Sequence, residues 1–355
     1  MITEDQILKE LIRIINKYDF TVDNKKEIPE PKEKWITIKG THILLKDGET
    51  IGSAFKRVTG ESLGKSNKPK KQDYYKNKAS KNYNKILEGL KESNKINIKP
   101  DDIIKTFAQN NKSFPAETIK KKIDEAIEYN YYIEKNHHQT FQYHSDGKGH
   151  YNKERKALHK KILNDLFINE KQAKPKNGQA PTFMVLGGRG GSGKSKFNGM
   201  VYDSKSYIVL DADAIKEKLP EYKGYNAFEV HEESSDILKK ALKIARKRGL
   251  NVVLDGTMKG YNSTEKKLRQ FKEDGYNIEM YYMHLPREKA AERAIGRFAG
   301  DEKDFSGRFV PLNILLNMKE NEENFNQLKK YASKWAFYNN DVERGQDPIL
   351  VNKSD

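Results

Sequence analysis

Apolar residues in the second half of the chain form short continuous runs, separated by longer stretches with helical periodicity. From about residue 182 this order predicts strands that alternate with helices. Because the runs are continuous, each strand is expected to be covered on both faces, as in a parallel sheet between layers of helices. The predicted strands are 183–186, 207–210, 251–254, 278–283 and 335–338. The pattern therefore predicts an α/β fold with a doubly wound parallel sheet flanked by helices.

The first half of the chain has a different pattern, which is mostly helical and polar. The expected elements are a helix over 7–18 behind a Thr3/Gln6 capping box, a hairpin over 34–45, and helices near Ile103 and over 119–127. Residues 65–99 are rich in Lys and Asn, so we interpret them as a linker or a loosely packed helix. We expect a small helix-plus-hairpin module (1–64), a basic linker or helical region (65–135) and an α/β domain (136–355).

Positive charge is concentrated before the α/β domain. The 355 residues carry a net charge of +16, and residues 51–100 hold 13 Lys and Arg against 4 Asp and Glu. Tyr74, Tyr75 and Tyr83 lie among these charges, and such a stretch can bind nucleic acid through counterion release and stacking. A solvated, lysine-rich linker explains residues 51–100 equally simply, and we favour it.

Composition also excludes several classes of protein. There is no cysteine, which excludes disulfides, thiol catalysis and cysteine zinc sites. The acidic start lacks the features of a secretory signal, and no apolar run reaches the 18 or so residues that span a bilayer. We expect a cytoplasmic protein, with no membrane partner. Five of the eight histidines are clustered, at His137, His138, His144, His150 and His159, but their spacing matches no metal motif, so we interpret them as surface or packing residues.

Residues 188–195 read Gly-Arg-Gly-Gly-Ser-Gly-Lys-Ser and directly follow the first predicted strand of the sheet. In this spacing the backbone N–H groups of a glycine-rich loop surround phosphate oxygens, and the following helix points its positive end at them. Lys194 would reach the terminal phosphates and the Ser195 hydroxyl would bind Mg²⁺. The expected cofactor-binding residues are Gly188, Arg189, Gly190, Gly191, Ser192, Gly193, Lys194 and Ser195. The alternative is a merely flexible glycine turn.

Polar residues follow two further strands at the edge where ligands collect in such sheets. Asp211 and Asp213 follow the strand 207–210, and Asp255 and Thr257 follow the strand 251–254. A carboxylate beside a bound triphosphate can bind magnesium or accept the proton of an attacking hydroxyl. The alternative for Asp211 or Asp213 is an N-cap of the helix predicted at 214–219.

Phosphoryl transfer also requires positive charge beyond Lys194 and the metal. The candidates are Arg287, Arg293 and Arg297, on or next to a predicted helix over 288–297, and Arg308, which follows a turn at 299–301.

A series of motifs resembles that of the zeta toxin family. In order along the chain, the motifs are the phosphate loop, Leu-Asp-Ala-Asp-Ala-Ile-Lys, His231-Glu232-Glu233-Ser234-Ser235, Val-Leu-Asp-Gly-Thr, Gly296-Arg297-Phe298 and Gly307-Arg308-Phe309. The resemblance covers about residues 145–345 and says nothing of residues 1–130. Residues 151–159 resemble the helix before the phosphate loop in phage-associated members. A short segment over 35–48 resembles one found in phage head-morphogenesis proteins, which leaves association with a virion open.

The resemblance implies a P-loop kinase that uses ATP and Mg²⁺ to phosphorylate the 3′-hydroxyl of a UDP-N-acetyl amino sugar and acts as a toxin. By motif, Asp213 would deprotonate the sugar hydroxyl, with Lys194, Arg297 and Arg308 around the transferred phosphate. The implied substrate-binding residues are Asp255, Thr257, His231 and Glu232, and Tyr338-Asn339-Asn340 would lie near the base. The residues after His231 depart from the family pattern, which leaves the acceptor open.

Two alternatives concern the N-terminal half. The P-loop domain, tethered to a basic nucleic-acid-binding region, would act on a polynucleotide end or a dinucleotide. Alternatively, the upstream helices would occlude the ATP pocket within one chain, in the manner of a partner antitoxin.

Overall fold

The computed structural model describes residues 34–38, 41–45, 95–111, 114–176, 178–300, 304–343 and 345–355. The chain divides into two compact units, one of residues 22–79 and one that contains residues 80–355. In the first, β1 (Lys34–Ile38) pairs antiparallel with β2 (Thr41–Leu45), which confirms the predicted hairpin. The helix predicted at 7–18, and most of the basic stretch over 51–100, lie outside the described residues.

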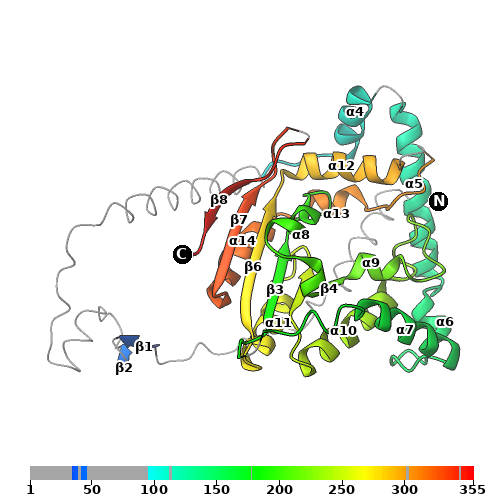
Figure 1. Ribbon diagram of the computed structural model, residues 1–355. Coiled ribbons are helices and arrows are strands. Elements are labelled where there is room, and N and C mark those ends of the chain that lie inside the picture. The colour runs from blue at the N-terminus through cyan, green and yellow to red at the C-terminus, as the bar shows by residue number, and fades with distance from the viewer. Residues whose placement is uncertain are drawn as a thin grey trace, which may run out of the picture. The chain divides into compact units, whose positions relative to one another are not determined.

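The second unit is built on a six-stranded sheet in the order β4-β5-β3-β6-β7-β8 (Figure 1). Its strands are β3 (Thr182–Gly187), β4 (Ile208–Asp211), β5 (Val252–Asp255), β6 (Asn277–His284), β7 (Lys334–Asn339) and β8 (Ile349–Lys353). The first five are parallel, as predicted, and β8 runs antiparallel to β7. The strand β8 was not predicted, because it lies at the sheet edge and its apolar run, 349–351, is only three residues long.

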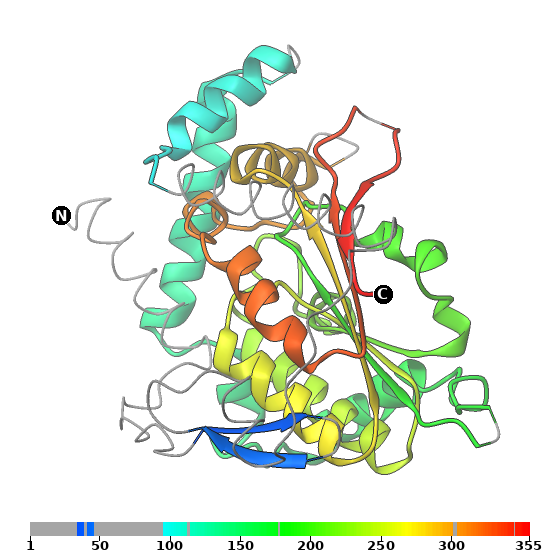
Figure 2. The same cartoon turned by 90° about the vertical axis from the view of Figure 1, so that its left-hand side faces the viewer.

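Helices surround this sheet, as Figure 2 shows from the side. They are α4 (Pro100–Asn110), α5 (Ala116–Lys135), α6 (Thr140–His144), α7 (Lys153–Leu166), α8 (Phe197–Met200), α9 (Ala212–Lys216), α10 (His231–Lys247), α11 (Tyr261–Glu273), α12 (Arg287–Ala299), α13 (Leu312–Leu316) and α14 (Asn321–Leu328), with short 3₁₀ turns at η1 (Lys194–Lys196), η2 (Ser204–Ser206) and η3 (Lys329–Tyr331). None of the helices in the described part of the chain is both long and apolar enough to cross a membrane.

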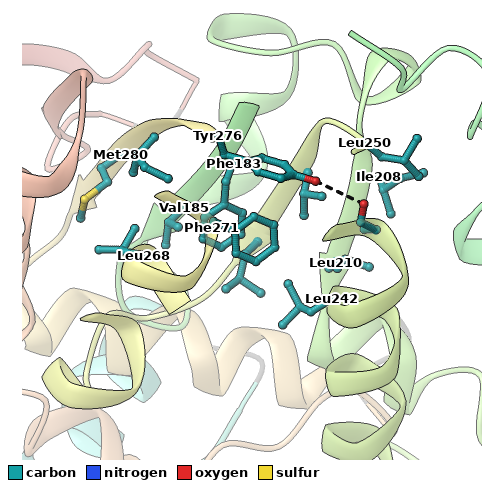
Figure 3. Close-up of a cluster of buried hydrophobic side chains, with 14 of the residues drawn as sticks. Phe183, Val185, Ile208, Leu210, Leu242, Leu250, Leu268, Phe271, Tyr276 and Met280 are labelled. Carbon is teal, nitrogen blue, oxygen red and sulfur yellow. Dashed lines mark hydrogen bonds between the residues drawn. The ribbon is translucent and has the colours of Figure 1, made fainter. Parts of the chain in front are cut away.

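The main core lies between the sheet and helices α10, α11 and α14 (Figure 3). Successive residues of β3 point to opposite faces, so Phe183 and Val185 enter this core while Met184 and Leu186 enter a smaller one on the other face. The Phe183 ring stacks on Phe271 of α11 with the centroids 3.7 Å apart. Burial on both faces explains why these strands are continuous apolar runs in the sequence.

A buried ion-pair network joins α7 to α10. The Arg155 guanidinium donates to Glu233 at 2.5 and 2.7 Å and to Glu221 at 2.8 Å, and His159 Nε2 lies 2.6 Å from Glu233 Oε1. Burial raises the pKa of Glu233, but hydrogen bonds from His159, Arg155 and Thr140 outweigh it and hold that pKa at about 2. The network fixes α7 against the first turn of α10, which begins at a predicted substrate residue, His231.

Glu233→Gln is expected to lower the free energy of unfolding by about 3 kcal/mol, because it leaves the buried Arg155 without its main counter-charge. Urea unfolding at neutral pH measures the change. The control is Glu154→Gln, which makes the same substitution at an exposed position of α7. It should change the free energy of unfolding by less than about 0.5 kcal/mol. A similar small shift for both variants would contradict the structural role of the network.

Candidate active site

The phosphate loop, residues 188–195, begins directly after β3 and has a conformation that glycine permits. Gly188, Gly191 and Gly193 have φ values of +139°, +85° and +89°. A Cβ atom on Gly188 would lie 2.6 Å from the Met283 carbonyl oxygen, so no other residue fits there. The sequence at these positions is therefore required by the backbone, as expected for a loop whose N–H groups converge on an anion.

Two side chains outside the loop hold its backbone in place. Asn340, directly after β7, donates from Nδ2 to the Ser192 carbonyl at 2.7 Å, and Arg293 of α12 donates to the Gly191 carbonyl at 3.3 Å. The motif resemblance placed Asn340 near the nucleotide base, whereas the structure places its amide on the phosphate loop. These contacts depend on tertiary packing, so sequence spacing gave no signal for them.

The helix expected after the phosphate loop is reduced to the 3₁₀ turn η1 and the short α8. Inside α8, Asn198 and Gly199 have non-helical backbone angles, and Asn198 Oδ1 accepts from the Ser204 N–H at 3.0 Å. The helix that was expected to point its positive end at the phosphate is therefore short and irregular. The Asn-Gly pair is a turn signal that the sequence already contained.

Lys194 lies at the centre of the polar groups around the loop. Its Nζ donates to the Gly188 carbonyl at 2.9 Å and lies 3.6 Å from Asp255 Oδ1. The neighbouring Ser195 side chain is exposed. An ammonium and a free hydroxyl side by side at the end of the loop are the two groups that the motif requires for phosphate and metal.

Arg189, the second residue of the loop, faces the interior instead. Its side chain is 1% exposed, donates to the Met318 carbonyl at 2.9 Å and forms an ion pair with Glu322. Burial raises the pKa of Glu322, but His284 and Arg189 outweigh it and hold that pKa at about 2. Because the guanidinium is fully engaged, Arg189 can offer a phosphate its backbone N–H alone.

The acidic residues predicted at two strand ends do come together, because β4 and β5 are neighbours and Asp211 lies opposite Asp255 in register. Asp211 Oδ1 accepts from the Asp213 N–H at 2.8 Å, so Asp211 is the N-cap of α9. Asp213 is held differently, with Oδ1 3.1 Å from Lys216 Nζ and Oδ2 2.5 Å from Arg308. The cap interpretation therefore applies to Asp211, and Asp213 carries the charged contacts.

The electrostatics of Asp213 and Asp255 differ in direction. Burial raises the pKa of Asp213, but Lys216 and Arg308 outweigh it, so the net pKa lies below its ordinary value and the group is ionised at neutral pH. Burial also raises the pKa of Asp255, aided by Asp211 and Asp213, and Lys194 offsets this only in part, which leaves it at about 6. Two carboxyl groups with opposite shifts at one site are typical of divided roles in catalysis.

Because Asp255 ionises less readily in the folded protein than in the unfolded chain, it lowers stability by an amount that grows from about pH 4, where the unfolded carboxyl ionises, and is full above about pH 6. Asp255→Asn is therefore expected to raise the free energy of unfolding by about 2 kcal/mol at about pH 8, and by only about 0.5 kcal/mol near pH 4. Denaturant unfolding at the two pH values tests this, with the exposed Asp165→Asn as control. A gain that is equal at both pH values would contradict the assigned pKa.

Besides Arg293, which contacts the phosphate loop, two of the candidate arginines lie near Asp213. Arg297 of α12 has a pKa below its ordinary value because it is buried and because Arg308 lies nearby. Arg287, at the start of α12, instead donates to the Leu316 carbonyl at 2.5 Å. Arg297 and Arg308 therefore place two positive charges beside Asp213, whereas Arg287 has a structural contact.

Of the remaining predicted substrate residues, His231 lies near Asp213 and Thr257 lies at the phosphate loop, whereas the charged neighbours of Glu232 are Lys239 and Asp236. Burial and the Lys216 ammonium lower the pKa of His231 to about 3, so its ring is neutral, and burial raises the pKa of Glu232. The Thr257 carbonyl accepts from the Gly188 N–H at 3.4 Å, which ties this residue to the phosphate loop. Lys216, which is 8% exposed, was not among the predicted site residues. Its signal was its position three residues after Asp213 on a helix.

The described residues contain no group of three His, Asp or Glu side chains that converge on a metal position. Of the clustered histidines, His150 pairs with Asp146 and His159 with Glu233. A magnesium ion bound to nucleotide phosphates needs only one or two protein oxygens, and Ser195 with Asp255 fits that donor set.

Comparison with known proteins gives one family. The model of the zeta toxin family matches residues 165–343, about half of the chain. No curated protein matches the sequence. Among solved structures, a chain of the PezAT chromosomal toxin–antitoxin system of Streptococcus pneumoniae is 16% identical, with a TM-score of 0.42 over 56% of this chain and 80% of that one. A chain of the AvrRxo1-ORF1:-ORF2 complex with ATP is 16% identical, with a TM-score of 0.44 over 58% and 68%.

Proposed function

The chain belongs to the zeta toxin family of P-loop kinases, and from this premise we propose that it transfers the γ-phosphate of ATP to a hydroxyl of a UDP-N-acetyl amino sugar and is toxic to the cell in which it acts. The observation that carries the proposal is the ionised Asp213 carboxylate at the end of β4. It lies between Lys216 and Arg308, on the same sheet edge as the phosphate loop.

The donor half of the site is the phosphate loop. Its N–H groups and Lys194 would bind the ATP phosphates, while Asn340 and Arg293 keep the loop backbone rigid. A Mg²⁺ ion held by Ser195, with Asp255 nearby, would neutralise charge on the phosphates. The pKa of Asp255, about 6, leaves most of this carboxyl ionised at neutral pH, as binding a cation requires.

The acceptor half is built around Asp213. The acceptor hydroxyl forms a new bond to the γ-phosphorus, the bond from that phosphorus to the bridging oxygen of ADP breaks, and the hydroxyl proton passes to Asp213. Arg308 contacts Asp213 in the structure, so it must move from the carboxylate to the transferred phosphate as the acceptor enters. Arg297 and Arg308 then stabilise the charge on the phosphate oxygens.

The choice of acceptor rests on the residues that face Asp213. A neutral His231, the Thr257 element and the buried Lys216 provide hydrogen-bond donors suited to a polar, phosphate-bearing sugar. The resemblance of the motifs to those of the family supports a UDP-N-acetyl amino sugar in particular.

Incubation of the full chain with γ-labelled ATP and Mg²⁺ tests this proposal. The acceptors are UDP-N-acetylglucosamine, a dinucleotide and oligonucleotides with free hydroxyl ends, each analysed by mass spectrometry. We expect a singly phosphorylated UDP-sugar. Label in the dinucleotide or oligonucleotide alone would replace the proposed acceptor, and no transfer to any hydroxyl would contradict the kinase assignment.

A further inference from the structure

Helices α4 and α5 lie outside the stretch matched by the family model, yet they pack against α12 and α13 of the kinase fold (Figure 1). One continuous core joins Ile103, Ile104, Phe107, Ile119, Ile123 and Ala126 to Ala291, Ile295, Phe298, Ala299, Phe305, Phe309, Leu312 and Leu316. Phe107 also lies 3.5 Å from the position of a Cβ on Gly296, which precedes Arg297. Residues 100–135, which we expected in a linker or separate helical region, are therefore integral to the kinase unit.

A chain of aromatic rings leads from these helices to the active-site arginines. Phe107 of α4 contacts Phe114, before α5, at a centroid distance of 6.1 Å, and Phe114 contacts Phe305 edge-on at 5.8 Å. From Phe305 the contacts continue to Phe298 at 5.3 Å and from there to Phe309 at 4.9 Å. Phe298 and Phe309 are the direct sequence neighbours of Arg297 and Arg308.

The backbone before Arg308 is held in a conformation that it would not adopt unaided. Phe305 has a φ of +60°, which a bulky side chain rarely adopts and which costs free energy. The Phe305 side chain is nevertheless only 8% exposed, because Phe114 and Phe298 surround it. Burial against Phe114 thus offsets strain three residues before Arg308.

The second helix also holds the loop on the other side of Asp213. Asn130 of α5 donates to the Tyr225 carbonyl at 2.7 Å and accepts from the Phe228 N–H at 3.2 Å. We call residues 219–230 the acceptor loop. The backbone of this loop contacts the backbone on either side of Arg308. The Phe309 N–H donates to the Gly224 carbonyl at 3.1 Å, and a Cβ on Gly224 would lie 2.5 Å from the Gly307 carbonyl.

We propose that α4 and α5 form a positioning scaffold for catalysis, in which Phe114, through Phe305, sets the place of Arg308 relative to Asp213. The inference rests on the proposed kinase function. Phe114 is a positioning residue, since it acts through its ring contact with Phe305. The scaffold packs against the outer side of the arginine-bearing helix and contributes to its order, so its loss lowers activity.

The test compares Phe114→Ala with two further variants in the full-length protein. Phe114→Ala is expected to lower kcat for the acceptor by about 10-fold to 100-fold with KM for ATP within about 3-fold, because small displacements of a positioned group have effects of this size. Phe114→Tyr retains the ring and should recover most of the rate. Ile133→Ala removes a more deeply buried side chain from the far end of α5, outside the cluster that contains Phe305, and should leave kcat within about 2-fold.

Amide hydrogen exchange supplies a readout that does not depend on finding the acceptor. Phe114→Ala should speed exchange of the Phe309 N–H and its neighbours over 304–309, and leave β3 unchanged. Unaltered exchange there would overturn the scaffold even if the kinase assignment is right, and faster exchange would support it even if no acceptor is phosphorylated. A rise in turnover in Phe114→Ala would also overturn it and favour an in-chain inhibitory region.

Discussion

Asp213→Ala is expected to lower kcat for acceptor phosphorylation by about 10³-fold, and to leave the fold intact. The variant loses the carboxylate that accepts the hydroxyl proton, a contribution of about 10² to 10⁴ in general base catalysis. It also leaves Lys216 and Arg308 without their shared partner. Single-turnover kinetics with the identified acceptor measure the loss, and circular dichroism checks the fold.

Asp211→Asn is the matched control for this variant. Asparagine caps helices as well as aspartate does, so the hydrogen bond to the Asp213 N–H is retained while one negative charge of the same motif is removed. Its kcat should stay within about 3-fold of the unmodified enzyme, since Asp211 carries no assigned proton transfer. Near-normal turnover in Asp213→Ala would show that the base is another group, and Asp255 would be the next candidate.

Lys194→Ala is expected to lower kcat/KM for ATP by about 10³-fold, because the ammonium is the side-chain charge that the loop itself directs at the phosphates. Lys196→Ala, two residues further along, is the control. The Lys196 ammonium lies 3.6 Å from the Asp347 carboxylate and does not contact the loop carbonyls that Lys194 contacts. Its removal should therefore change kcat/KM by less than about 3-fold. Equal losses in both variants would mean that general positive charge, and not the loop lysine, binds the nucleotide.

The same Lys194 variant has a second expected effect, on Asp255. The Lys194 ammonium holds the pKa of Asp255 down against burial, so without it the pKa should rise above about 6. The destabilisation by Asp255 should therefore start at the same pH, which the unfolded chain sets, but reach its full size at a higher pH in Lys194→Ala. Denaturant unfolding across the range from about pH 5 to pH 8 would follow this shift.

The parallel strands of the sheet and the position of the acidic residues could be predicted from the sequence alone. Strands buried on both faces leave continuous apolar runs, so β3 and its four parallel neighbours could be read directly. Parallel strands end at one edge, so Asp213 and Asp255 could be placed beside the phosphate loop. These inferences depend on local pattern and on a general rule of sheet geometry.

The remaining features depend on contacts between distant residues, which no local pattern encodes. Asn340 supports the phosphate loop across 148 positions of sequence, and nothing in its own neighbourhood indicates this. A helix was expected near Ile103, but nothing in the residues of α4 indicates that its packing partner is α12. Arg189 occupies a position of the phosphate loop, so the sequence suggests a phosphate ligand. The structure shows that its guanidinium instead forms a buried ion pair with Glu322.

The pairing of Asp213 with Arg308 affects how fast the enzyme would hydrolyse ATP when no acceptor is bound. Each carboxylate oxygen of Asp213 already accepts from a cation, Oδ1 from Lys216 and Oδ2 from Arg308, and both cations make the carboxylate a weaker base towards a water molecule. An acceptor that binds in place of Arg308 releases the base and brings its own hydroxyl to it, which water does not do. The resting enzyme is thereby protected against futile hydrolysis of ATP, and a low ATPase rate in the absence of acceptor follows from the closed ion pair.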